Sequence, residues 1–197
     1  TYLESFKEIL SNRSAVACLV GSILRSIAWM VILVYGISFF RERFLKPEGS
    51  EGSASVIILV AALLYTLGSL VCGRFLNRFG RKPLTVLATL LAGIFTISFI
   101  FVPNLWLSLA LNFLGCWFGG MGFSAISSLT LEQVPKFRGT MMSINSAAMN
   151  LGSALGAALG GLTLVLFDYE VLGLTLGAMG VVAAIVFQTL AIDPTRT

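Results

Sequence analysis

The longest uncharged stretch of the sequence covers residues 83–131 and contains 49 residues without a charged side chain. As one helix it would extend roughly 73 Å, whereas the hydrocarbon core of a bilayer is about 30 Å thick. It must therefore cross a membrane twice, and Pro103-Asn104 supplies the break between spans at about 83–102 and 105–130. The chain is an integral membrane protein.

Composition supports the same conclusion and excludes several functions. The 197 residues are 57% hydrophobic and 11% charged, with a mean hydropathy of +0.94, whereas soluble domains carry about 25% charged residues. The net charge of +4 lies mainly in loops between hydrophobic spans, so it does not indicate nucleic-acid binding. The chain has no His, and its three Cys form no close pair, so we expect no metal site and no disulfide framework.

No pattern typical of an enzyme is present. Every acidic residue lies near the end of a span or in a loop, so no buried carboxylate pair is available for acid–base catalysis. A hydrolytic triad lacks its His base, and no P-loop occurs. We therefore expect no catalytic residues and no cofactor.

The hydrophobic pattern predicts an all-α membrane protein with six transmembrane helices in one domain over residues 14–192. The expected spans are 14–40, 55–75, 83–102, 105–130, 139–167 and 171–192. Residues 1–13 are amphipathic and read equally well as a helix along the membrane surface or as a frayed linker. Residues 193–197 form a tail.

The distribution of basic residues predicts the orientation. If both termini are cytoplasmic, nine Lys and Arg residues lie in inside loops and three lie in outside loops. The inside set is Lys7, Arg13, Arg74, Arg78, Arg81, Lys82, Lys136, Arg138 and Arg196, and the outside set is Arg41, Arg43 and Lys46. This bias follows the positive-inside rule, so we expect a multi-pass plasma-membrane protein with cytoplasmic termini.

A short basic turn joins the second and third spans and carries the most specific motif. Its marked positions are Gly73, Asn77, Arg78, Gly80, Arg81 and Lys82. They resemble the Gly-x-x-x-Asp-Arg-x-Gly-Arg-Arg/Lys signature between the second and third helices of a major facilitator superfamily repeat. The residues also predict that the turn fixes the topology, because so cationic a segment does not cross a bilayer.

Two further patterns support this resemblance. Pro135-Lys136-Phe137-Arg138-Gly139 resembles a Pro-x-x-x-Arg-Gly turn of drug-exporter-like members. The fifth span contains Gly152, Gly156, Gly160 and Gly161, which resemble the glycine-rich antiporter motif, with Ala157 where that motif has Pro. Small residues at this spacing favour close helix packing, which is the role we expect for these glycines. The alternative is a more specific role as a hinge or seal in antiport.

The family is built from two six-helix halves, so the resemblance implies that this chain is one half of a transporter, and we favour the C-terminal half. In the family, the acidic residue of the basic turn faces a helix N-terminus across the two halves and helps to latch the outward-open state. Asn77 stands at that position and has no charge for the helix dipole to attract. The resemblance therefore implies a weaker latch here.

Arg25 is the only charged side chain well inside a predicted span. A cation there costs about 2.5–3.5 kcal/mol, so it normally faces a polar cavity. Family members line their central cavity with the first and fourth helices of each half, which makes Arg25 a candidate for contacting a substrate or pairing with an acid of the other half. A structural hydrogen bond to a backbone carbonyl is the alternative. The full set of candidate cavity residues is Ser22, Arg25, Ser26, Trp29, Tyr65, Asn112 and Asn145.

The sequence thus predicts one half of a secondary transporter that moves a small organic solute or drug-like compound by alternating access. Its expected partners are the lipid bilayer, the substrate and the other six-helix half. No buried carboxylate is present in this half, so a coupling ion such as a proton is expected to bind mainly to the other half. A non-transporting membrane scaffold or regulator and a homo-oligomeric channel are the alternatives.

Overall fold

A computed structural model describes residues 2–45 and 50–194, and the fold within these ranges is entirely helical. The elements are α1 (Tyr2–Ser11), α2 (Arg13–Met30), the π-helix η1 (Val31–Tyr35), α3 (Gly36–Arg43), α4 (Ser50–Phe79), α5 (Arg81–Phe101), α6 (Leu105–Leu131), the 3₁₀-helix η2 (Pro135–Phe137), α7 (Arg138–Leu166) and α8 (Tyr169–Leu190). The ends of the predicted lead-in and tail, and the basic residues Lys46 and Arg196, lie outside the described residues.

Within the described chain, six helices are long and apolar enough to cross a membrane, which confirms the prediction of six spans. The first span runs from Arg13 to Arg43 and consists of α2, η1 and α3 in continuous succession. The second continues as α4 to Phe79, a turn beyond the predicted end. The break at Pro103-Asn104 falls as predicted, and the Asn104 side chain caps α6 by accepting a hydrogen bond from the Leu107 N–H at 3.2 Å.

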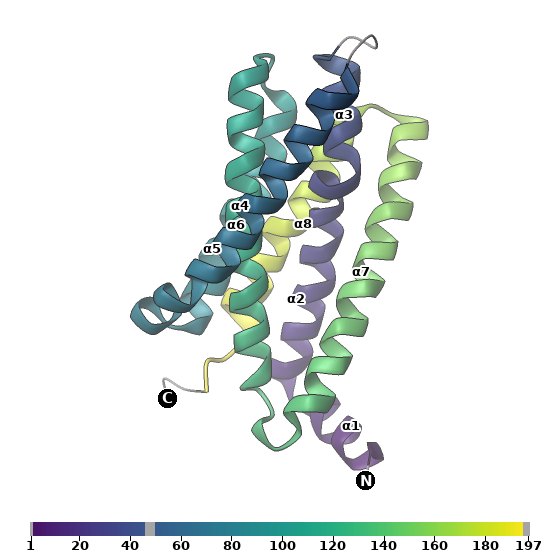
Figure 1. The fold of residues 1–197 in the computed structure, drawn as a ribbon. Coiled ribbons are helices and arrows are strands. Elements are labelled where there is room, and N and C mark those ends of the chain that lie inside the picture. Colours follow the sequence, from purple (N-terminus) through teal and green to yellow (C-terminus); the bar gives the residue numbers. More distant parts are fainter. Residues whose placement is uncertain (1, 46–49, 195–197) are drawn as a thin grey trace.

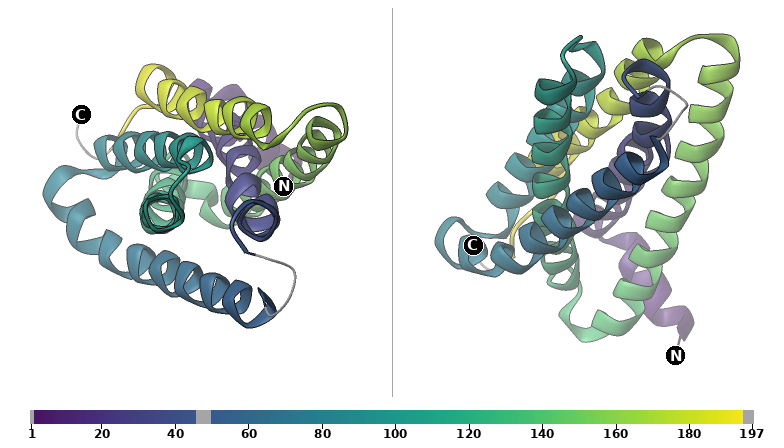
Figure 2. Two further views of the ribbon diagram at one scale, coloured as in Figure 1. Left: turned by 90° about the horizontal axis from the view of Figure 1, so that it is seen from above. Right: turned by 45° about the horizontal axis from the view of Figure 1, so that its top comes forward.

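The six spans pack as a bundle with α2 near its centre and with α4 and α7 on its flanks (Figure 1). α2 packs against α7 and α8, while α6 packs against α4 and α5. The view from above shows α4 and α7 at the periphery (Figure 2). In the most hydrophobic 18-residue stretch of the first span, 67% of the residues are buried, compared with 11% in the second span and 17% in the fifth. The two flanking helices therefore keep most of their surface for lipid or for other protein.

The connections that carry the predicted inside charges gather at one end of the bundle. The amino-terminal helix α1, the α4–α5 turn, the η2 loop and the end of α8 all lie there (Figure 1). We call this the basic end. Gln133 holds it together, because its side-chain amide donates hydrogen bonds to the backbone carbonyls of Leu129 and Ile192, and its own backbone carbonyl accepts one from Asn12.

An aromatic cluster closes the opposite end. Phe39 and Phe40 are 1% exposed and contact Phe99 with ring centroids 5.7 and 5.8 Å away. Arg43 follows on the same helix, donates a hydrogen bond to the Ile100 carbonyl at 3.0 Å and lies 3.6 Å from a carboxylate oxygen of Glu170. These contacts hold the end of the first span against the third and the sixth.

Candidate functional site

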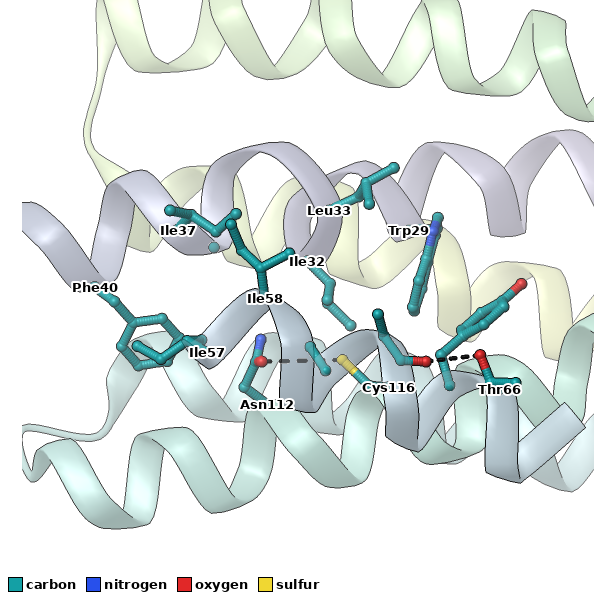
Figure 3. Close-up of a pocket in the computed structure, with 14 residues that line it drawn as sticks. Trp29, Ile32, Leu33, Ile37, Phe40, Ile57, Ile58, Thr66, Asn112 and Cys116 are labelled. Carbon is teal, nitrogen blue, oxygen red and sulfur yellow. Dashed lines mark hydrogen bonds between the residues drawn. The ribbon is translucent and has the colours of Figure 1, made fainter. Parts of the chain in front are cut away.

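A pocket of about 310 Å³ lies between the first, second and fourth spans. It begins near the middle of the first two spans, beside Trp29 and Tyr65, and extends away from the basic end to Phe40 (Figure 3). Its aliphatic wall comes largely from Ile57 and Ile58 of α4. The described residues that line it carry no charge, and those with polar side-chain atoms are Trp29, Tyr65, Thr66, Asn112 and Cys116. The Thr66 hydroxyl donates a hydrogen bond to the Ala62 carbonyl at 2.8 Å. Such a site suits a ligand that is mostly apolar.

An aromatic wall separates this pocket from the interior of the bundle. The Trp29 and Tyr65 rings lie 4.8 Å apart at 41°, and Tyr65 in turn contacts Phe123 with centroids 6.2 Å apart. Trp29 reaches this position because Gly119 on α6 has no side chain, and an added Cβ there would collide with the indole ring. Tyr65 is placed by the close approach of α4 to α6 at Gly120, which packs directly on the Tyr65 backbone.

Arg25 lies behind this wall and does not line this pocket. Its Nη2 donates a hydrogen bond to the backbone carbonyl of Gly119 at 2.6 Å, and the residue is 6% exposed. The guanidinium carbon lies 5.9 Å from the ring centroids of both Trp29 and Phe123. This contact is the structural hydrogen bond to a backbone carbonyl that the sequence analysis gave as the alternative role of Arg25. A contact between Arg25 and a substrate or an acid of another chain stays a prediction.

The remaining polar candidates of the first span face the fifth span. The Ser22 hydroxyl donates a 2.8 Å hydrogen bond to the Asn145 side-chain oxygen, and both residues are at most 1% exposed. Ser26 is buried beside Gly152 on the same helix as Asn145. The seven candidates are therefore divided among three places: Trp29, Tyr65 and Asn112 line the pocket, Arg25 lies behind it, and Ser22, Ser26 and Asn145 lie between α2 and α7.

The basic turn is a separate site at the basic end. Gly80 lies between α4 and α5, as the N-cap of α5, with a φ of 91°, a conformation that favours glycine. A polar hollow of about 660 Å³ lies beside it, lined by Gly73, Arg74, Asn77 and Arg81 among others. Arg78 is exposed, and Lys82 donates its backbone N–H to the Asp193 carboxylate at 3.4 Å. Asn77 is exposed on this surface, so it is accessible to any partner that packs there.

Glu132 links the two basic motifs of the sequence. One of its carboxylate oxygens lies 3.4 Å from Arg81 of the basic turn, and the other accepts a 2.9 Å hydrogen bond from Arg138. Arg81 also donates to the Ser128 hydroxyl at 2.9 Å. Sequence reasoning did not single out Glu132, although it is the first charged residue after the 49-residue uncharged stretch and lies between the two motifs.

The glycines of the fifth span pack against the first span. An added Cβ at Gly152 would collide with the Ile23 backbone, one at Gly156 would lie 2.9 Å from the Ile27 Cα, and one at Gly160 would collide with the Tyr35 ring. Gly161 is less constrained, since a Cβ added there would lie 3.6 Å from the Tyr35 hydroxyl. Tyr35 in turn donates its hydroxyl hydrogen to the Ala157 carbonyl.

The sequence analysis did not identify the aliphatic pocket residues of α4. Helical spacing could have indicated them, since Ile57 and Ala61 precede Tyr65 at intervals of four residues.

The chain belongs to the Major Facilitator Superfamily, which its sequence matches over residues 15–197. It is therefore a membrane protein of a transporter family. Separately, no group of three or more potential metal ligands occurs among its described residues.

Its relatives include several kinds of transporter. It is 31% identical over 133 residues to the multi-drug resistance efflux pump PmrA of Streptococcus pneumoniae, which covers 67% of this chain and 33% of the pump. It is 24% identical over 183 residues to a Na(+), Li(+), K(+)/H(+) antiporter of Planococcus maritimus, covering 90% of this chain and 42% of the antiporter. The chain thus spans less than half the length of these relatives.

The fold is that of a solved transporter. The crystal structure of a mutant of the nucleoside transporter NupG matches it with a TM-score of 0.79, over 96% of this chain and 51% of that one, at 20% identity. The six-helix arrangement is therefore one repeat of the superfamily fold, as the resemblance in the sequence implied.

Proposed function

We propose that this chain is one six-helix half, the C-terminal one, of a secondary transporter that exports a small organic or drug-like compound by alternating access. The observation that carries the proposal is the pocket between the first, second and fourth spans, with its uncharged walls and the Trp29–Tyr65 pair. Ligand pockets of this kind bury an apolar body and orient it with a few polar groups, here Asn112 and Thr66.

The names of the relatives agree with an organic substrate. PmrA is a multi-drug efflux pump, and a gentisate transporter of Corynebacterium glutamicum is 25% identical over 154 residues. The described residues that line the pocket include no carboxylate to hold an alkali cation, which supports the organic class over the cation class of the Planococcus relative. We place the coupling ion mainly in the other half, both termini in the cytoplasm, and the protein in the plasma membrane.

The test is transport by the full-length protein in proteoliposomes, with the fluorescent aromatic drug ethidium as the first probe. Ala61→Trp places an indole in the pocket, and we expect it to abolish most of the transport. Val165→Trp, at a position that is 82% exposed on α7, is the matched control and should leave transport nearly unchanged. Equal loss of transport in both variants, or full transport by Ala61→Trp, would contradict the assignment of this pocket.

A further inference from the structure

A second apolar groove lies near the basic end, between the end of α4, the start of α5 and the middle of α6. Its volume is about 350 Å³, and its walls are formed by apolar side chains that include Phe75, Phe79, Leu84, Leu87, Trp117 and Phe118. The groove is distinct from the proposed substrate pocket, with which it shares no lining residue. Its size falls within the range of about 300–1,000 Å³ that ligand sites occupy.

The groove and the polar hollow lie on different sides of α4. Asn77 and Gly73 line the hollow, whereas Phe75 and Phe79 line the groove. Each phenylalanine is two positions from Asn77, which places it about 200° around the helix at 3.6 residues per turn. The two rings stack on one another with centroids 6.0 Å apart at 10°, so they form a continuous apolar surface.

A cation lies against one of the phenylalanines that line this groove. The Arg78 guanidinium carbon lies 5.7 Å from the centroid of the Phe79 ring, and Arg78 is exposed. Among the residues that the structure describes, Arg78 forms no ion pair with a carboxylate. Residues 73–83 carry four basic side chains and no acid, because Asn occupies position 77. Of these four, and within the described part of the chain, Arg81 is the one whose side chain pairs with a carboxylate, that of Glu132.

The depth of the groove indicates what occupies it. α4 ends at Phe79 and α5 begins at Arg81, so the lining residues that these two helices contribute up to Leu87 lie within about two turns of the end of a membrane span. The groove continues from there to Trp117 in the middle of α6. Near the span end, acyl chains meet headgroups, and a guanidinium binds phosphate through charge-assisted hydrogen bonds. We propose that the groove binds an anionic phospholipid, with an acyl chain along Phe75 and Phe79 and the headgroup phosphate on Arg78.

Trp117 lines the groove and provides a local reporter. The protein is prepared with every tryptophan other than Trp117 replaced by Phe, and it is reconstituted with phosphatidylglycerol or phosphatidylcholine brominated on the acyl chains. Bromine quenches indole fluorescence at contact. We expect brominated phosphatidylglycerol to quench Trp117 at a mole fraction about fivefold lower than phosphatidylcholine, since one basic side chain near a membrane surface contributes about that factor.

Arg74→Gln is the control for general attraction to an anionic surface. Arg74 is one turn from Arg78 but lines the polar hollow instead of the groove. Arg78→Gln should remove the preference for phosphatidylglycerol, and Arg74→Gln should keep most of it. Equal quenching by the two lipids, or equal effects of the two substitutions, would overturn the proposal.

A second measurement covers the case in which the tryptophan replacements prevent folding. The protein with its natural tryptophans is heated in detergent with added phosphatidylglycerol or phosphatidylcholine. We expect a larger increase of the melting temperature with phosphatidylglycerol, and we expect Arg78→Gln to abolish the difference. Identical shifts with the two lipids would refute an anionic lipid site.

Discussion

At the scale of single residues, two polar side chains of α2 connect it to different helices. Ser22 bonds to Asn145 on α7, and Arg25, less than one turn further along, bonds to the Gly119 carbonyl on α6. Both contacts are buried, so neither polar group has to face lipid. The first span is thereby tied to the fourth and fifth spans near its middle.

The Ser22–Asn145 hydrogen bond should contribute measurably to stability. We expect Asn145→Ala to lower the free energy of unfolding, and a double-mutant cycle with Ser22→Ala to give a coupling energy between about 0.6 kcal/mol, the average for such bonds between membrane helices, and about 1.7 kcal/mol, the maximum. Denaturation of the purified protein in detergent measures both quantities.

Asn150 supplies the matched control, since it lies on the same helix but is exposed. Asn150→Ala should change the free energy of unfolding by no more than about 0.5 kcal/mol. A coupling energy of zero between positions 22 and 145 would show that the buried hydrogen bond does not stabilise the protein.

Sequence reasoning identified most of these polar residues but not their partners. The cost of a buried cation marks Arg25 from the sequence alone, whereas its direction depends on Gly119, which leaves room for Trp29 and offers its carbonyl. The sequence analysis also placed Ser22 and Ser26 in one candidate cavity with Trp29. The structure separates them, because α7 approaches α2 on the serine side and α4 approaches it on the tryptophan side.

At the scale of helices, glycines set how closely the spans approach. α7 packs on α2 through Gly152 and Gly156, α4 packs on α6 through Gly68 and Gly120, and α5 crosses α8 where Gly93 meets Gly180. Span positions followed from the sequence, because hydrophobic length and charged loops determine them. Helix pairing did not follow, because small residues occur on several spans and each contact needs a partner on another helix.

Gly152→Ala and Gly139→Ala make the same chemical change at two positions of α7. A methyl group at position 152 would collide with the backbone of Ile23, and backbone cannot move aside cheaply. We expect Gly152→Ala to destabilise the protein by about 1–3 kcal/mol, as overpacking does. No atom lies within 4 Å of the Cβ position at Gly139, so Gly139→Ala should be neutral or stabilise by up to about 1 kcal/mol.

Melting temperatures of the two variants in detergent test this difference. If both variants melted at the temperature of the natural protein, the close contact between α2 and α7 would be contradicted.

At the scale of the whole molecule, the basic end defines how the protein is oriented. The α4–α5 turn, the η2 loop and α1 lie together there, and they contain most of the loop arginines and lysines (Figure 1). From the positive-inside rule we expect this end to lie in the cytoplasm. The start of α6 lies toward the opposite end (Figure 1), and it carries Trp106, which is 78% exposed.

Labelling with a membrane-impermeant maleimide tests this orientation. In a background in which Cys18, Cys72 and Cys116 are replaced by Ser, we expect Trp106→Cys to react in intact cells. Lys136→Cys, in η2 at the basic end, should react only after the membrane is permeabilised. The reverse pattern would show that the protein is inserted with the basic end outside.

The π-helix Val31–Tyr35 affects how positions in this span can be compared with those of relatives. A π-turn holds one residue more than an α-turn, so residues before and after η1 follow separate helical registers. Trp29 lies before this extra residue, and Ile37 and Phe40 lie after it, yet all three line one pocket. In a relative whose first span is α-helical throughout, the counterpart of Phe40 would be displaced by one position, about 100° around the helix. An alignment of this span with such a relative therefore requires a one-residue gap in the relative's sequence, opposite Val31–Tyr35.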